Sequence, residues 1–411
     1  NSAVCASCHS TIFKQWSNSM HHFMGQSDPY YVVLEDMAAK DAGEPFRAWC
    51  MGCHEPQALL SGETRTTGIA RLFDHDGQGL YADLLTYAHA LDEGTGCLFC
   101  HRVTKIEDSG GTVAANASVN VDPEDRPLLP GETSDFGPLR SFADQLIRAR
   151  PEVHAQSMMQ NIKDNNDLCA ACHEEFAPGT GSFIVDTYAE WAASPFNAPN
   201  NPQRNRTCMD CHMHASVASI GTPVPGQSTD GGPMEANVVT HQFVGAQYHL
   251  VGLHDRGAQA ESIALLRSAA KLSVQPAAKP DEVTVRVTNT GAGHDLPTGI
   301  SDLREMWLAV TVTDATGKTV LTSGTLAANG DLDPEAHMFV KVLAGLDAHS
   351  VEPMFWRYMR MKQDTRIPAG KFRDESYDLP PGTAYPVKID AKLMFRTFPQ
   401  QITDLVRQRF P

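Results

Sequence analysis

The chain has 411 residues, of which 42% are hydrophobic, and a formal net charge of −16 at pH 7. This length can bury a sizeable core, and we expect two domains. The negative charge argues against nucleic acid and anionic membranes as partners. No apolar run is long enough to cross a bilayer.

Five pentapeptides of the form C-x-x-C-H contain all ten cysteines, at residues 5–9, 50–54, 97–101, 169–173 and 208–212. This pattern is the attachment signature of c-type haem. Two thiols three residues apart share one face of a helical turn, so both can bond to one porphyrin. The histidine then becomes the proximal iron ligand. We therefore expect five haem c groups, bonded to Cys5, Cys8, Cys50, Cys53, Cys97, Cys100, Cys169, Cys172, Cys208 and Cys211, with proximal ligands His9, His54, His101, His173 and His212.

Zinc sites and disulfides are the competing interpretations of these cysteines. Zinc requires no histidine directly after the second cysteine of a pair. A disulfide framework would not place every cysteine at one spacing. The repeated histidine therefore favours haem.

The haem motifs occupy residues 1–215, with so few residues per motif that porphyrins must form much of the core. Short helices and long loops are expected there. Helical patterns are clearest at about 139–163 and at 186–194, and segment 107–138 is rich in Gly, Pro, Asp and Ser and predicts a loop. Residues 216–258 form a bridge that is rich in Gly, Pro and Thr and contains three histidines.

The pattern changes after this bridge. Residues 258–272 predict an amphipathic helix, and from about residue 276 alternating apolar residues predict strands around 283–287, 308–312, 320–321 and 387–393. The predicted fold class is α+β, with a short-helix, loop-rich multihaem domain followed by an all-β, sandwich-like domain. The predicted boundaries are 1–258 for the haem domain, 259–275 for a connecting helix and 276–411 for the β domain.

Each proximal histidine leaves the opposite iron face open. Seventeen histidines minus the five proximal ones leave twelve, enough for five bis-histidine haems. The 15 methionines are an alternative supply of ligands. We rank His214, His249 and His254 between the favoured candidates and the less favoured ones, which are His75, His89, His337 and His349. The favoured ones are His21, His22, His154, His241 and His294.

Several neighbourhoods resemble the multihaem cytochrome c superfamily, which includes relatives of hydroxylamine oxidoreductase and exported cytochromes of metal-respiring bacteria. The resemblance rests on segments 5–21, 93–103, 187–196, 208–213 and 291–299. It implies that His21, His154, His241 and His294 are distal ligands. The fifth could come from His22, His249 or a neighbouring subunit. His214 stands where relatives commonly have proline, which leaves open whether it is an extra ligand.

The leading functional prediction is electron transfer through closely packed haems, by a carrier rather than an enzyme. We expect export to the periplasm or the cell exterior, with a leader removed before Asn1. Expected partners are other redox proteins or extracellular acceptors in anaerobic respiration, and a filament of identical subunits is a further hypothesis. The alternative is an oxidoreductase acting on a small nitrogen or sulfur compound at one open haem. In the pentahaem nitrite reductases that the chain resembles, a lysine replaces the motif histidine at the active haem. This sequence has no C-x-x-C-K motif, which weakens the alternative without removing it.

Overall fold

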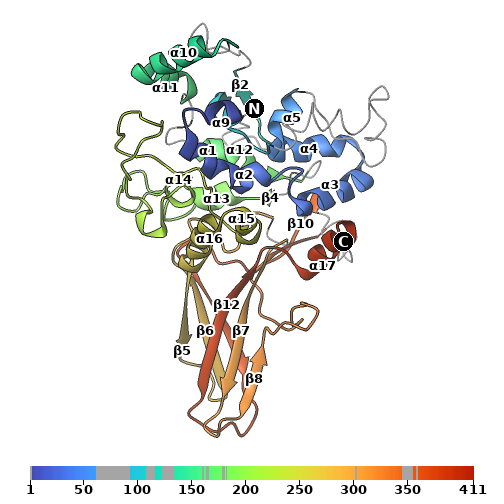
Figure 1. The fold of residues 1–411 in the computed structure, drawn as a ribbon. Coiled ribbons are helices and arrows are strands. Elements are labelled where there is room, and N and C mark those ends of the chain that lie inside the picture. The colour runs from blue at the N-terminus through green and yellow to red at the C-terminus, as the bar shows by residue number, and fades with distance from the viewer. Residues whose placement is uncertain are drawn as a thin grey trace. The chain divides into compact units, whose positions relative to one another are not determined.

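The computed structural model describes residues 2–61, 93–107, 116–122, 134–159, 162, 166–177, 181, 183–300, 303–344, 355–357 and 360–411. The chain forms two compact units. Unit one contains Asn1–Cys172 and Arg206–Ile263, and unit two contains His173–Asn205 and Ala264–Pro411. Figure 1 gives the element labels that are used below. The predicted domain boundaries remain predictions.

Unit one is built from short helices, many of which begin at proline or end at a haem motif. Proline is the first residue of α3, α4 and α5, where its missing N–H costs no helical hydrogen bond. The helices are α1 (Ser10–Ser17), α2 (Met20–Phe23), α3 (Pro29–Ala42), α4 (Pro45–His54), α5 (Pro56–Ser61), α9 (Cys97–His101), α10 (Gly137–Ala149), α11 (Glu152–Met158), α12 (Asn166–His173), α14 (Cys208–His212) and α15 (Tyr248–His254), with 3-10 turns η1 (Ser2–Cys5) and η2 (Val217–Ser219). α12 crosses the unit boundary at its last residue.

Two predictions for unit one need correction. The helix expected at about 139–163 is two helices, α10 and α11, because Pro151 stands at the break and the residue before a proline disfavours helical geometry. The loop expected at 107–138 contains the short strand β2 (Val119–Val121), which pairs antiparallel with β1 (Val103–Ile106). Residues 108–115 and 123–133 of that segment lie outside the described residues.

Unit two contains two three-stranded antiparallel sheets. One has the order β11-β6-β5, formed by Phe372–Asp378, Glu282–Asn289 and Ala270–Gln275. The other has the order β12-β7-β8, formed by Lys388–Arg396, Glu305–Thr313 and Thr319–Ser323. Smaller pairs are β3 (Glu175–Phe176) with β4 (Phe183–Val185) and β9 (Lys341–Ala344) with β10 (Arg360–Asp364). The other helical elements are α13 (Thr187–Ala192), η4 (Phe355–Arg357) and α17 (Gln400–Arg409).

The two three-stranded sheets share one hydrophobic core. Val283, Val285 and Val287 of β6 are buried, as are Leu308 and Val310 of β7. Successive side chains of a strand point to opposite faces, so the alternating pattern of β6 places these valines on a single face. The predicted strands at these positions are confirmed, and the mixture of helices and antiparallel sheets confirms the α+β class.

One prediction for the later part of the chain was wrong in extent, and one element was missed. The helix expected at 258–272 is α16 (Arg256–Ser268), and Ala270–Leu272 belong to β5 because they pair with β6 in register, Leu272 opposite Val287. The sequence pattern also gave no sign of α17 after the last strand.

Across the described residues, none of the helices is long and apolar enough to span a membrane.

Candidate cofactor sites

The ten cysteines are part-buried free thiols, and none forms a disulfide. Burial raises the pKa of Cys50 and Cys100 to about 12, whereas the neighbouring Cys5 lowers that of Cys97 to about 7. Within the described ranges, no group of three or more His, Cys, Asp and Glu side chains is arranged to hold a metal ion.

Four motif histidines share one arrangement. The Nδ1 atoms of His9, His54, His101 and His212 lie 2.6, 2.7, 3.0 and 2.7 Å from the backbone carbonyl oxygens of Ser228, Met24, Met158 and Val244, respectively. A carbonyl can only accept, so each Nδ1 carries the proton and donates it. The Nε2 lone pair of each ring is then available to a metal, which is the tautomer that ligating histidines require.

Two of these histidines face another histidine at a distinctive separation. The ring centroids of His9 and His154 lie 6.1 Å apart with 21° between their planes. Those of His101 and His241 lie 6.2 Å apart with 16° between their planes. Both partners, His154 and His241, were predicted as distal ligands.

This separation matches two imidazoles on opposite sides of one iron. A metal–nitrogen bond of about 2.0 Å, with the ring centroid about 1.1 Å beyond the nitrogen, gives centroids about 6.2 Å apart. The Nδ1 of His154 is also buried with no hydrogen-bond partner among the residues that the structure describes. The residues present therefore fit a haem iron at both positions.

His241 is held by the segment that carries motif five. The N–H of Thr240 donates to the carbonyl of Met213 at 2.9 Å, and the N–H of Val244 donates to that of His212 at 3.1 Å. His212 returns a bond through its Nδ1–H to Val244. The loop around His241 and the proximal histidine of motif five thus hold each other in place. Burial lowers the pKa of His241 to about 4, which keeps the imidazole neutral, as a metal ligand must be.

Unit two contains a third pair of neighbouring histidines, His173 and His294. Burial lowers the pKa of His294, and the nearby His173 lowers it further, so this imidazole is also neutral. Its Nδ1–H donates to the carbonyl of Asp295 at 2.9 Å, which leaves Nε2 for a metal. His294 was predicted as a distal ligand, and this environment suits that role.

The other candidate histidines have well-defined neighbours that do not identify an iron. The Nδ1–H of His22 donates to the carbonyl of Ser17 at 3.0 Å, and the ring of His21 packs against Phe243 at 4.1 Å. His249 contacts Tyr30 edge-on at 5.9 Å, and His254 packs against Phe23 at 4.1 Å. The distal ligands of all five motifs remain predictions. His75, His89 and His349, ranked low from sequence, lie outside the described residues.

His214 is buried beside motif five. Its Nδ1–H donates to the carbonyl of Cys211 at 2.5 Å, and its Nε2 lies 3.8 Å from a carboxylate oxygen of Glu261. These contacts support the turn that follows the motif. Its role as an extra ligand remains a prediction.

Cysteines of different motifs lie against one another in unit one. The thiols of Cys5 and Cys97 are close enough for each to shift the pKa of the other, and so are those of Cys169 and Cys208. Cys169 is also close enough to Cys100 to raise the pKa of that thiol. The attachment cysteines of motifs one, three, four and five therefore form a continuous series.

Motif two is next to motif three in the same unit. The hydroxyl of Thr95 donates to the carbonyl of Cys53 at 3.2 Å, and the N–H of Gly96 donates to the side-chain carbonyl of Gln57 at 2.6 Å. Thr95 and Gly96 lead directly into Cys97. The five attachment motifs are thereby neighbours of one another within the described residues.

One supporting cluster was not predicted from sequence. The ring of Tyr31 packs parallel to that of His54 at 4.3 Å, and its hydroxyl donates to Glu35 at 2.9 Å. Arg47 binds the other oxygen of Glu35 at 2.9 Å and also contacts Asp36 and Glu44. A tyrosine and a glutamate four residues apart share a helix face, which was the available signal, but such a pair is common in ordinary helices.

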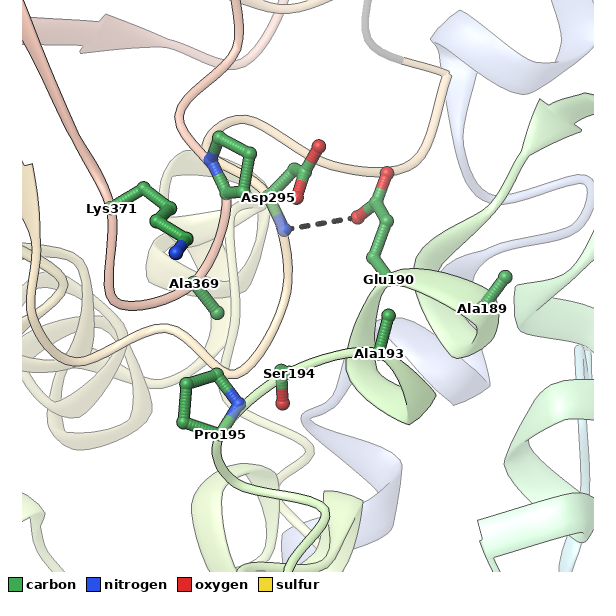
Figure 2. A pocket seen from close by; sticks show the side chains of 9 residues that line it. Ala189, Glu190, Ala193, Ser194, Pro195, Asp295, Ala369 and Lys371 are labelled. Atoms are coloured by element: carbon green, nitrogen blue, oxygen red, sulfur yellow. Dashed lines mark hydrogen bonds between the residues drawn. The ribbon is translucent and has the colours of Figure 1, made fainter.

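A pocket of about 430 Å³ lies beside the His294 loop in unit two. Figure 2 shows Glu190 on α13 receiving a hydrogen bond from the backbone N–H of Asp295, while Lys371 lines another part of the wall. The pocket therefore borders the loop that holds a candidate iron ligand.

Comparison with known proteins agrees with this geometry. Residues 4–71 match the family model for "Cytochrome c554 and c-prime". The fold is similar to the crystal structure of a penta-heme cytochrome c552 from Thermochromatium tepidum, with a TM-score of 0.62 and 19% sequence identity over 100% of this chain and 94% of that one. No curated protein matches the sequence significantly. The family match covers an N-terminal part of the chain that contains motifs one and two, and the structural likeness shows a similar fold.

Proposed function

We propose that this chain carries electrons through five covalently bound c-type haems as an exported protein of a respiratory pathway. The observation that carries the proposal is the contact between cysteines of different motifs, Cys5 with Cys97 and Cys169 with Cys208. Thioether bonds at touching cysteines would bring the edges of neighbouring porphyrins together. Such proximity serves electron transfer and is not required for haem binding.

Three histidine pairs would hold irons from both sides: His9 with His154, His101 with His241, and His173 with His294. His54 and His212 would hold the remaining two irons, with His21, His22 and His249 as the candidate distal ligands. Haem iron, when bound, supplies reversible one-electron chemistry at a potential that axial ligands and burial set. The backbone carbonyls that accept from Nδ1 orient the proximal rings and make them more basic.

These neighbours support an order of attachment sites in which motifs one, three, four and five would follow one another and motif two would adjoin motif three. Motif three is then central, and motifs one and five lie at opposite ends of the series. The net charge of −16 would steer a basic redox partner toward the protein.

The test is anaerobic stopped-flow oxidation of the fully reduced holoprotein by a soluble ferric chelate. The wild-type protein should hold five haems and release electrons from all of them in fast phases. Loss of the central site in the C97A/C100A variant should leave some haems oxidised slowly, whereas loss of the terminal site in C208A/C211A should leave the others fast. Equal rates in both variants, or fewer than five haems in the wild-type protein, would contradict the proposal.

A further inference from the structure

We infer that Glu190 is a positioning residue for His294, holding the loop at 293–299 so that the imidazole stays beside His173. The inference rests on the proposed function, in which His294 is an iron ligand. Both residues belong to unit two, Glu190 on α13 and His294 on the loop between β6 and β7.

Glu190 accepts two hydrogen bonds from the loop, both just after the histidine. Its Oε2 accepts from the backbone N–H of Asp295 at 3.1 Å and from the hydroxyl of Thr298 at 2.6 Å. The hydroxyl of Thr187, in the first turn of α13, lies 2.8 Å from that of Thr298. One turn of helix thus binds the loop on both sides of the Leu296–Pro297 peptide. Figure 2 shows the bond on the Asp295 side.

Arg366 fixes the direction of the Glu190 side chain. Its guanidinium contacts the Oε1 of Glu190, and it also binds Asp364 at 2.8 Å and Asp186 at 3.3 Å. The side chain of Arg366 is only 4% exposed, so these bonds form in a poorly hydrated environment, where charged hydrogen bonds are strong. The Oε1 of Glu190 therefore contacts Arg366, and its Oε2 accepts hydrogen bonds from the loop.

The opposite side of the loop is hydrogen-bonded to β6 and to Ile367. The side-chain amide of Asn289 donates to the carbonyl of His294 at 2.8 Å, and Leu296 exchanges two backbone hydrogen bonds of 3.0 Å with Ile367. These bonds fix the backbone on one side only. Without Glu190, the Asp295 N–H and the Thr298 hydroxyl would lose the acceptor that restrains the loop on the α13 side, next to the pocket.

The experiment measures the spin state of the oxidised holoprotein by quantitative electron paramagnetic resonance in four variants. H294A should show roughly one high-spin haem per chain, because it removes a ligand outright. E190A should show a high-spin signal from a fraction of one haem, and E190Q, which keeps a carbonyl acceptor for the loop, should restore most of the low-spin signal. The matched control is E375Q, because Glu375 is a part-buried glutamate of the same unit that binds His337 and Arg373.

A wild-type spectrum for E190A, together with a high-spin signal for H294A, would overturn the positioning role and leave the proposed function intact. A wild-type spectrum for H294A would overturn the ligand assignment, and the inference with it. If E190A does not fold, the T298V variant tests the inference instead. It removes one of the two hydrogen bonds between the loop and Glu190, and it should shift the low-spin g values. A T298V spectrum identical to that of the wild-type protein would then contradict the inference.

Discussion

His101 and His241 lie with their ring centroids 6.2 Å apart and their planes 16° apart, although they are distant in the sequence. His101 ends α9, and His241 occupies a loop paired with motif five through Thr240 and Val244. The candidate distal ligand of motif three is therefore held by backbone bonds to the segment of motif five. A change at one site is expected to influence the other, because the two share this segment.

Replacing His241 with methionine should raise the midpoint potential of one haem. A thioether stabilises ferrous iron relative to ferric iron better than an imidazole does, so we expect a rise on the order of 0.1 V or more. Spectroelectrochemical titration of H241M measures this shift. H254M is the control, because His254 packs against Phe23 and is not assigned to an iron. Equal potentials in H241M and the wild-type protein would show that His241 is not a ligand.

Arg47 should be essential for the stability of unit one. Its side chain is 3% exposed and that of its partner Glu35 is fully buried. Removing one member of such a pair leaves an uncompensated buried charge, which costs about 3–5 kcal/mol. Denaturant unfolding of R47M should show this loss of free energy of unfolding. The double variant R47M/E35L should recover most of it, and a double variant as unstable as R47M would argue against the charge explanation.

Gly52 is expected to tolerate no side chain. A Cβ at this position, inside motif two, would lie 2.0 Å from the side-chain oxygen of Asn116 and 3.3 Å from its backbone oxygen. G52A should therefore displace the turn at residues 116–117 and destabilise the protein by about 1–3 kcal/mol. Thermal unfolding tests this. G137A is the matched control, because a Cβ at Gly137 meets no atom within 4 Å, and the two variants should not behave alike.

Unit two should lose stability as the pH rises through the neutral range. Burial and the neighbouring Asp186 raise the pKa of Glu190 from 4.5 to about 8, more than Arg366 lowers it. A group with a raised folded-state pKa binds more protons in the folded than in the unfolded state. Its stabilisation is therefore complete below the unfolded pKa and is lost as the pH passes the folded one.

The measurement is the thermal midpoint of the holoprotein between about pH 6 and about pH 9. The midpoint of the wild-type protein should fall across this window, and the midpoint of E190Q should fall less, since glutamine does not titrate. Parallel pH profiles for the two proteins would show that Glu190 is not the responsible group.

The sequence predicted the attachment sites because five identical motifs encode a local covalent pattern. It also predicted the strands around Val285 and Leu308, because alternating apolar and polar residues indicate a half-buried strand. It ranked His154 and His241 among the distal candidates. It could not pair them with His9 and His101, because each pair joins segments that are far apart in the sequence and meet only in the folded chain.

The supporting residues were beyond the reach of the sequence pattern. Tyr31 and Glu35 resemble any polar helix face until their ring and hydroxyl contacts with His54 and each other are seen. Glu190 was noted only as part of a helical segment, since its partners Thr298 and Arg366 come from distant loops. The predicted helix is split at Pro151 because the residue before a proline disfavours helical geometry, and the apolar periodicity alone did not indicate this break.

The most direct test of the account is the electron paramagnetic resonance spectrum of the oxidised wild-type protein, quantified per haem. Bis-histidine ligation at all five motifs predicts low-spin signals alone, integrating to five haems per chain. A stoichiometric high-spin signal would mean that one iron has an open face. Such an iron would contradict a pure electron carrier and would favour catalysis at that haem.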